Sequence, residues 1–204
     1  MKSDFKIALQ YLLFSIFFIV TSFILAYYFW WRIDEGSVEF FIIVLSTMIC
    51  WVGIGYLSTL ISSKIIFNNL LEVGFVSPFK LIKSGFFYET KGIKTAKKFK
   101  TTFSSFAFPI LFVFIFLFYK IVNFVEKTDL TYYGVEKIVK IEKISYYKGS
   151  KRAHLSFEFN NKKIKKVIYL KDTLKKVGDF EKIIFSFRNP YILKSKIDFE
   201  ENSR

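Results

Sequence analysis

Apolar and polar positions are distributed very unevenly along this chain. Three runs without charged side chains lie in the first two-thirds, at residues 7–31, 40–63 and 101–119. A helix over the first run would be about 37 Å long, which exceeds the hydrocarbon core of a bilayer, about 30 Å thick. The pattern predicts three transmembrane helices, at about residues 7–31, 40–63 and 101–125.

The first two runs form a predicted transmembrane helical hairpin over residues 1–63. The first run ends in aromatic residues instead of a small-residue cleavage site, so we expect an uncleaved anchor whose aromatic end lies at the level of the lipid headgroups. A short polar turn separates the two runs. Its acidic residues are of a type that binds cations, but we expect them to be solvated instead: Asp34, Glu35 and Glu39.

The second run carries small residues at helical spacing. Such residues let helix backbones approach closely in a membrane, so they predict a packing seam, either within the chain or between subunits. The candidate positions are Ser46, Cys50, Gly53, Gly55, Ser58 and Thr59.

Residues 64–100 form a basic connector in which lysines alternate with large apolar side chains. This mixture is typical of helices that lie in the membrane interface, with apolar groups at the acyl boundary and ammonium groups at anionic headgroups. The alternative is a re-entrant element at residues 65–88. The candidate membrane-surface residues are Lys80, Lys83, Lys94, Lys97, Lys98 and Lys100.

The hydrophobic period changes to two residues within the last part of the chain, residues 126–204. Apolar side chains alternate with polar ones at residues 153–159 and 182–187, as in strands with one buried face. Residues 134–147 predict an earlier strand, with a β-bulge where the apolar parity changes between Ile138 and Val139. The pattern predicts a small antiparallel β domain, either a half-open barrel or a sandwich, outside the membrane.

Three further elements complete this predicted domain. Residues 163–170 form a strand without a clear buried face, residues 172–176 form one helical turn, and residues 191–199 form a last strand. Two hairpin turns are predicted by residue type: Lys148-Gly149-Ser150-Lys151 and Asn160-Asn161-Lys162.

Three short motifs in this domain carry a resemblance. They are the strand end Phe157-Glu158-Phe159-Asn160-Asn161-Lys162-Lys163, the turn Val177-Gly178-Asp179, and Asn189-Pro190 after the next strand. Their order resembles a group of bacterial membrane proteins of unknown function that carry a small extracytoplasmic β domain. The resemblance covers the last third only and implies a fold, not an activity. The group's usual plan has a helix that returns to the membrane after the domain, which this sequence lacks.

Composition adds a strong positive charge, a formal +14 at pH 7, that is segregated from the apolar runs. Lysine greatly outnumbers arginine, a bias that AT-rich codons produce, so the charge alone does not indicate nucleic-acid binding, and we expect none. The single cysteine, Cys50, lies in an apolar run and excludes an internal disulfide and a cysteine metal cluster. We expect no cofactor and no metal.

Candidate catalytic chemistry is sparse. The only histidine, His154, has no Cys, Ser or acid at a motif spacing and has the outward parity of its strand, so we expect an exposed structural histidine. Spans one and two hold no Asp, Glu, Lys, Arg or His, which disfavours ion-coupled transport. The sequence therefore predicts no enzyme.

We expect a membrane-anchored binding or interaction protein, an accessory or protective factor of the cell envelope, in contact with the bilayer and with a protein partner or a second copy. The alternative is a subunit of a small oligomeric channel or transporter. Lys94, Lys97, Lys98 and Lys100 before the third run, against Lys127 after it, predict a multi-pass protein of the cell membrane with a cytoplasmic N-terminus and an extracytoplasmic β domain.

Overall fold

The structure is a computed structural model that describes residues 2–34, 37–68, 70, 73–83, 91–172 and 174–201. The chain divides into two compact units. The helical unit consists of Met1–Tyr27 and Ile42–Tyr119, and the sheet unit consists of Tyr28–Phe41 and Lys120–Arg204. Each is described by itself.

Three long helices carry the apolar runs. They are α1 (Lys2–Trp30), α2 (Ser37–Phe67) and α5 (Ile93–Tyr133), and each is long and apolar enough to cross a membrane. The prediction of three such helices is confirmed, but α5 extends beyond residues 101–125 in both directions. Its first turns include the last lysines of the predicted connector, and it continues through Pro109. A helix satisfies its backbone hydrogen bonds internally, which is the condition for crossing a bilayer.

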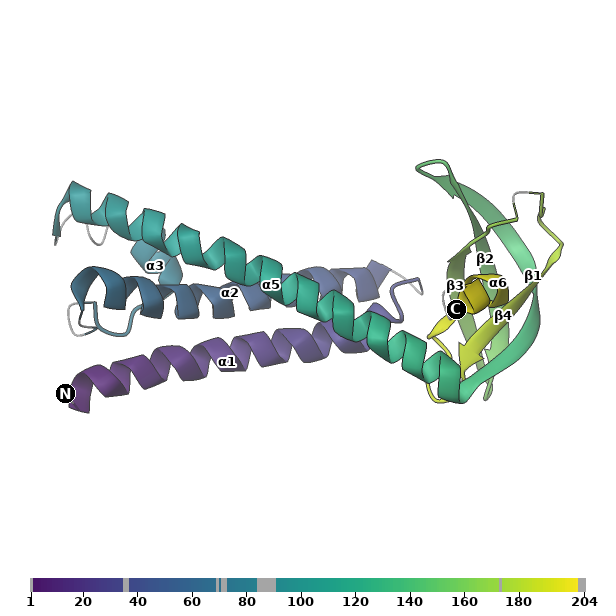
Figure 1. The fold of residues 1–204 in the computed structure, drawn as a ribbon, viewed down its shortest axis with the longest axis horizontal. Helices are drawn as coiled ribbons and strands as arrows, with labels where there is room; N and C mark the ends of the chain where they lie inside the picture. The colour runs from purple at the N-terminus through teal and green to yellow at the C-terminus, as the bar shows by residue number, and fades with distance from the viewer. Residues whose placement is uncertain are drawn as a thin grey trace. The chain divides into compact units, whose positions relative to one another are not determined.

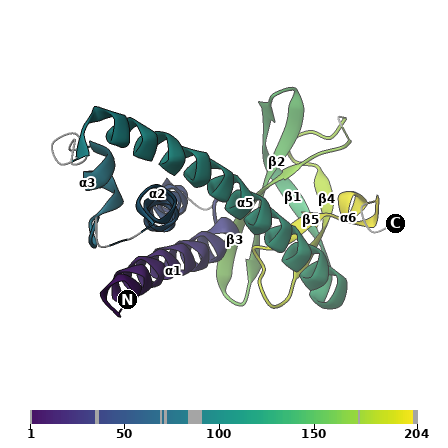
Figure 2. The ribbon, with the colours of Figure 1, turned by 60° about the vertical axis from the view of Figure 1, so that its left-hand side comes forward.

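Within the helical unit, α2 lies between α1 and α5 (Figures 1 and 2). A core of buried side chains joins α2 to α5, with Ile54 of α2 against Phe99, Phe103 and Ala107 of α5. Leu81 of the short helix α3 (Pro78–Lys83) completes this core.

The loop between α2 and α3 is fixed on α1 by a buried tyrosine. The Tyr11 hydroxyl donates a hydrogen bond to the Gly74 carbonyl at 3.0 Å and accepts one from the Val76 amide at 3.0 Å. Near the start of α1, Asp4 accepts the Leu70 amide at 2.6 Å and forms an ion pair with Lys64 of α2. These contacts place the start of α3 beside α2.

The sheet unit contains a five-stranded antiparallel sheet with the strand order β3-β2-β1-β4-β5. The strands are β1 (Gly134–Tyr147), β2 (Ser150–Phe159), β3 (Lys162–Tyr169), β4 (Phe180–Ser186) and β5 (Leu193–Ser195). The sheet is strongly curved, and its edge strands β3 and β5 also come into contact (Figure 1). This is a half-barrel, one of the two predicted forms.

Turn chemistry fixes the register of the two hairpins. Asn160 and Asn161 between β2 and β3 both have positive φ, as do Lys148 and Gly149 between β1 and β2. Two consecutive residues with positive φ are the requirement of a type I′ turn, whose twist matches that of the flanking strands. Both turn predictions are confirmed.

The predicted bulge is real but was misplaced. The pairing of β1 with β2 shifts between Ile141 and Lys143, not between Ile138 and Val139. The parity signal was misleading because Ile138 is an exposed apolar residue, 65% accessible, whereas Val139 and Ile141 face the core.

Two predictions for the end of the chain were wrong. No helix forms within the described part of residues 172–176, because the Asp172 carboxylate accepts the Leu174 amide at 2.9 Å in a local turn. The last strand is limited to β5, and α6 (Lys196–Glu201) follows where residues 191–199 were predicted to continue extended. Lys196 and Glu200 form an ion pair at the i, i+4 spacing that favours a helix.

The core of the sheet unit lies on the concave side of the sheet. Ile141, Leu155, Ile164 and Ile183 are almost completely buried there, together with Phe157, Phe185 and Leu193. Strands β2 and β3 therefore each have one buried face, including the strand at residues 163–170 whose facing the sequence left open.

Candidate functional site

The convex side of strands β1, β2 and β3 gathers the polar and aromatic side chains of the sheet. In register, Ser145 of β1, Arg152 of β2 and Tyr169 of β3 lie across one row, and Lys143, His154 and Val167 lie across the next. We call this surface the outer face: Glu142, Lys143, Ser145, Tyr147, Arg152, His154, Ser156, Glu158, Lys163, Lys165, Val167 and Tyr169.

Arg152 of the outer face contacts two aromatic rings. Its guanidinium carbon lies 4.3 Å from the ring centroid of Tyr147 and 4.6 Å from that of Tyr169. The guanidinium also donates a hydrogen bond to the Tyr169 hydroxyl. Lys148 lies over the same Tyr147 ring at 5.4 Å. A planar cation is thus held between two aromatic rings that are each about half exposed, 50% and 53%.

His154 is not the exposed histidine that its parity suggests. Its side chain is half-buried, and its Nε2 lies 2.9 Å from the Ser145 hydroxyl on β1. The sequence missed this pair because the two residues come together only through the β1–β2 register. Among the described residues, the imidazole forms its one hydrogen bond with Ser145, so the pair resembles a cross-strand hydrogen bond more than a catalytic dyad.

Acidic side chains interrupt the basic character of the outer face. Glu142, the extra residue of the bulge, accepts a hydrogen bond from Ser156 and lies 3.9 Å from the ammonium of Lys163. Glu158 is exposed on the same side of β2. The outer face therefore offers both signs of charge, with cations in excess.

The turn between α1 and α2 contacts the sheet, against our expectation of a solvated acidic hairpin. Lys166 of β3 forms an ion pair with Asp34 at 2.9 Å and donates to the Trp31 carbonyl at 2.9 Å. The Arg32 guanidinium lies between the rings of Tyr28 and Tyr191, at 4.7 and 5.0 Å from their centroids. Glu35 lies outside the described residues. Sequence analysis missed these partners because they are far apart in the chain.

An ion-pair cluster on the other half of the sheet perturbs several pKa values. The Lys182 and Lys196 ammonium groups beside Glu136 lower the pKa of its carboxyl, and Glu136 in turn raises the pKa of Lys196. Glu201 and Asp198 of α6 raise the pKa of Lys171 in the same way. All these groups are at least partly solvent-accessible, and the Glu136 ion pairs add side-chain contacts between β1, β4 and α6 to the backbone pairing of β1 with β4.

The predicted seam residues of α2 are mostly buried within the helical unit. Ser46, Ser58 and Thr59 are fully covered, and Cys50 is half-buried. A side chain at Gly53 would collide with Ile19 and with the Ser15 carbonyl of α1, at 2.8 and 3.0 Å from the added carbon. A side chain at Gly55 would meet Pro78 of α3 at 3.2 Å. The described contacts are thus within one chain.

The predicted membrane-surface lysines belong to two helices. Lys80 lies on α3, and Lys83 ends that helix, although its side chain is outside the described ones. The other four lie in the first turns of α5, with exposed side chains: Lys94, Lys97, Lys98 and Lys100. Of the predicted re-entrant alternative at residues 65–88, residues 69, 71, 72 and 84–88 lie outside the described residues.

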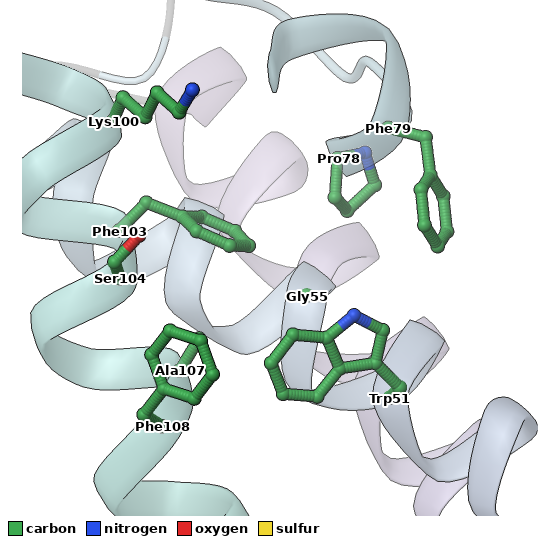
Figure 3. A pocket seen from close by; sticks show the side chains of 9 residues that line it. All are labelled: Trp51, Gly55, Pro78, Phe79, Lys100, Phe103, Ser104, Ala107 and Phe108. Atoms are coloured by element: carbon green, nitrogen blue, oxygen red, sulfur yellow. The ribbon is translucent and has the colours of Figure 1, made fainter. Parts of the chain in front are cut away.

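One of these lysines borders an apolar cavity of about 280 Å³ that the sequence did not predict. Figure 3 shows Trp51 and Gly55 of α2 on one side, Pro78 and Phe79 of α3 on another, and Phe103 of α5 pointing inward. Lys100 extends along its margin, and the ring of Phe108 lies 5.6 Å from that of Trp51.

Comparison with known proteins adds no relative. No protein-family model, curated protein or solved structure matches the chain. Within the described residues, no group of three or more His, Cys, Asp and Glu side chains is arranged to hold a metal ion. The structure itself defines the class: three helices compatible with transmembrane segments, followed by a five-stranded half-barrel sheet.

Proposed function

We propose that the chain is a membrane-anchored binding protein whose outer face recognises an acidic segment of another protein. The observation that supports this most directly is the Arg152 guanidinium held between the rings of Tyr147 and Tyr169. Arginine and tyrosine are the residue types that contribute most binding energy at protein interfaces. Because the stack already holds the arginine in place, little side-chain entropy is lost when a carboxylate binds.

The charges of the outer face favour a protein over a polyanion. Lys143 and Lys165 on the same face, and Lys148 over the Tyr147 ring, add positive charge that attracts carboxylates. Glu142 and Glu158 on the same surface would repel a continuous phosphate backbone or a sheet of anionic headgroups. The outer face carries both signs of charge with cations in excess. It therefore suits an acidic protein segment that also has basic residues, which would pair with the two glutamates.

The helices would supply the anchor. We further propose the cell membrane as its location, with the N-terminus in the cytoplasm and the sheet unit outside, because the lysines of α5 gather before its apolar run. The alternative of an oligomeric channel assembled through α2 has less support. The small residues of α2 that would form such a contact are buried within the chain.

Site-specific photo-crosslinking in the native membrane tests the proposed outer-face interaction. A photoreactive phenylalanine analogue at position 169 should yield a discrete adduct, whereas the same analogue at Leu174, which is 83% exposed and outside the outer face, should not. Because the stacked cation would be lost, Arg152→Gln in the first variant should remove the adduct. Equal adducts at both positions, or an adduct that survives Arg152→Gln, would contradict the proposal.

The adduct identified by mass spectrometry then allows a quantitative test. Binding of that purified protein to the full chain should weaken by about 30-fold on Arg152→Ala, the effect of losing a hot-spot residue. Lys176→Ala is the matched control, because it removes a positive charge outside the outer face. Loss of similar size in both variants would indicate general charge attraction instead of the proposed site.

A further inference from the structure

We propose that the cavity between α2, α3 and α5 is a binding site for one anionic phospholipid. One acyl chain would occupy the apolar cavity, and the phosphate would lie against Lys97 and Lys100. This inference is independent of the outer face, because every residue that it uses belongs to the helical unit.

The cavity has the chemistry of an acyl-chain site. Its walls are aromatic and aliphatic, with Trp51, Phe79, Phe103 and Phe108 as the largest contributors (Figure 3). An engineered cavity of about 150 Å³ with comparable walls accepts benzene, so about 280 Å³ is enough for part of a hydrocarbon chain. Among its described lining residues, three have side chains that can form hydrogen bonds: Lys100, Ser104 and Trp51 through its indole nitrogen.

A second hollow adjoins the cavity and is polar. Lys97, Lys100, Thr101, Ser104 and Ser105 line it, so the two hollows share Lys100 and Ser104. Four of these residues follow the spacing i, i+3, i+4 and i+7, which places them along one side of α5. The ammonium groups of Lys97 and Lys100 form no ion pair with the residues that the structure describes. Two such cations beside hydroxyl groups match the charge and hydrogen bonding of a phosphate diester.

The order of these residues along α5 matches the order of groups along a phospholipid. Lys100 precedes the uncharged run 101–119, so its ammonium is expected at headgroup level. From Lys100 to Phe108 the helix advances about 12 Å into that run. The polar hollow therefore lies where the phosphate of a lipid would be, and the cavity extends toward its acyl chains.

Quenching of tryptophan fluorescence by brominated lipids tests the site directly, since Trp51 lines the cavity. The full chain in nonionic detergent with excess phosphatidylcholine is titrated with phosphatidylglycerol brominated on its acyl chains. The Trp51→Phe variant reports the quenching of Trp30 and Trp31, and the difference gives the signal of Trp51. We expect saturable quenching of Trp51 by the brominated phosphatidylglycerol, and much weaker quenching by brominated phosphatidylcholine at the same concentration.

Variants separate the two parts of the site. Lys97→Gln with Lys100→Gln should weaken the binding of phosphatidylglycerol by about 30-fold, because each lysine near an anionic lipid contributes about fivefold and the two factors multiply. Lys94→Gln with Lys98→Gln removes the same charge from positions that line neither hollow, and should leave the titration unchanged. Ala107→Phe fills the cavity and should reduce quenching while all lysines are present.

Three outcomes would overturn the proposal. They are equal quenching by both brominated lipids, equal effects of the two lysine double variants, and relief of the quenching by inorganic phosphate, which would indicate a site for the free anion. Thermal unfolding of each variant in the same detergent identifies any loss of fold. The lysine variants keep the question decidable if Ala107→Phe does not fold.

Discussion

At the scale of single residues, the contacts that organise the sheet unit are charge and aromatic pairs between distant parts of the chain. Lys166 shows this most clearly. Its neighbours in sequence make it one of several lysines in an edge strand, yet its inward position in β3 directs it to Asp34 and the Trp31 carbonyl. Its side chain is only 13% exposed, and that of Asp34 is 23% exposed. Because both side chains are well covered, loss of one partner costs more here than at an ordinary surface ion pair.

Breaking this pair should destabilise the sheet unit. Lys166→Gln and Asp34→Asn should each lower the free energy of unfolding by about 1–3 kcal/mol, because each leaves a partly buried charge without its partner. The double variant should cost less than the sum of the two. Thermal or urea unfolding followed by the fluorescence of Trp31 measures all three. Lys165→Gln, one residue away on the outer face, is the control, and strict additivity of the two changes would argue against the pair.

Glu136 gives the sheet unit a pH dependence on the acidic side. The ammonium groups of Lys182 and Lys196 lower its pKa below the ordinary value of 4.5, so its ionised form is favoured by folding. The stability that it contributes is present above the unfolded pKa and is lost as the pH falls through the lowered folded pKa. The raised pKa of Lys196 keeps that partner charged throughout.

The Tm of the natural chain should therefore fall more steeply below about pH 4.5 than that of Glu136→Gln. Glu158→Gln, which changes an exposed carboxyl elsewhere on the sheet, is the control; parallel curves for Glu136→Gln and the natural chain would refute this role.

At the scale of elements, periodicity predicted most of what formed. The three apolar runs became helices, and the two-residue periods became β2 and β4 because burial of one face determines both. The errors lie where long-range contact decides. An exposed Ile138 shifted the predicted bulge, and the strand predicted after Asn189-Pro190 ends at Ser195, where α6 follows. The α5 helix extends through the polar residues after its apolar run and ends at Tyr133. At the next residue, Gly134, an added side chain would collide with the Leu130 carbonyl.

The candidate sites were predictable only in their parts. The lysines of α5 and the small residues of α2 could be named from the sequence, because each follows a helical spacing. The outer-face stack could not, since Tyr147, Arg152 and Tyr169 come from three strands whose register depends on two turns. The cavity could not either, because it depends on how the loop fixed by Tyr11 places Pro78 and Phe79.

The contact between α2 and α1 is a prediction at this scale. Gly53→Leu should destabilise the helical unit by about 1–3 kcal/mol, because the new side chain would overlap Ile19 and the Ser15 carbonyl, a backbone atom that has little room to move. Phe112→Leu on α5 is the control, since the Phe112 side chain is 68% exposed. Thermal stability in detergent distinguishes the two. If both variants unfold at the temperature of the natural chain, the close approach of α2 to α1 at Gly53 is excluded.

At the scale of the whole molecule, the division into two units separates two kinds of proposed binding. The helical unit would contact lipid through the cavity and the lysines of α5, and the sheet unit would contact a protein through the outer face. Both proposals depend on the side of the membrane on which each end of the helices lies. A cytoplasmic start of α5 would bring Lys97 and Lys100 to the leaflet that is richest in anionic lipid. The orientation therefore links the two sites and is itself open to test.

The predicted orientation has the N-terminus and the start of α5 in the cytoplasm and the sheet unit outside. Lysines close to the ends of a span are retained on the cytoplasmic side, and α5 has four in its first turns against Lys127 beyond its apolar run. The lysines of the sheet unit oppose this reasoning, but charges far from a span influence orientation less than adjoining ones.

Alkaline phosphatase fused after Glu201 should be active, and a fluorescent protein that matures only in the cytoplasm should be dark at that position. Fusions placed after Phe67 should give the reverse result, which controls for expression. An active fluorescent protein after Glu201 would place the outer face in the cytoplasm, and its acidic partner would then have to be sought there.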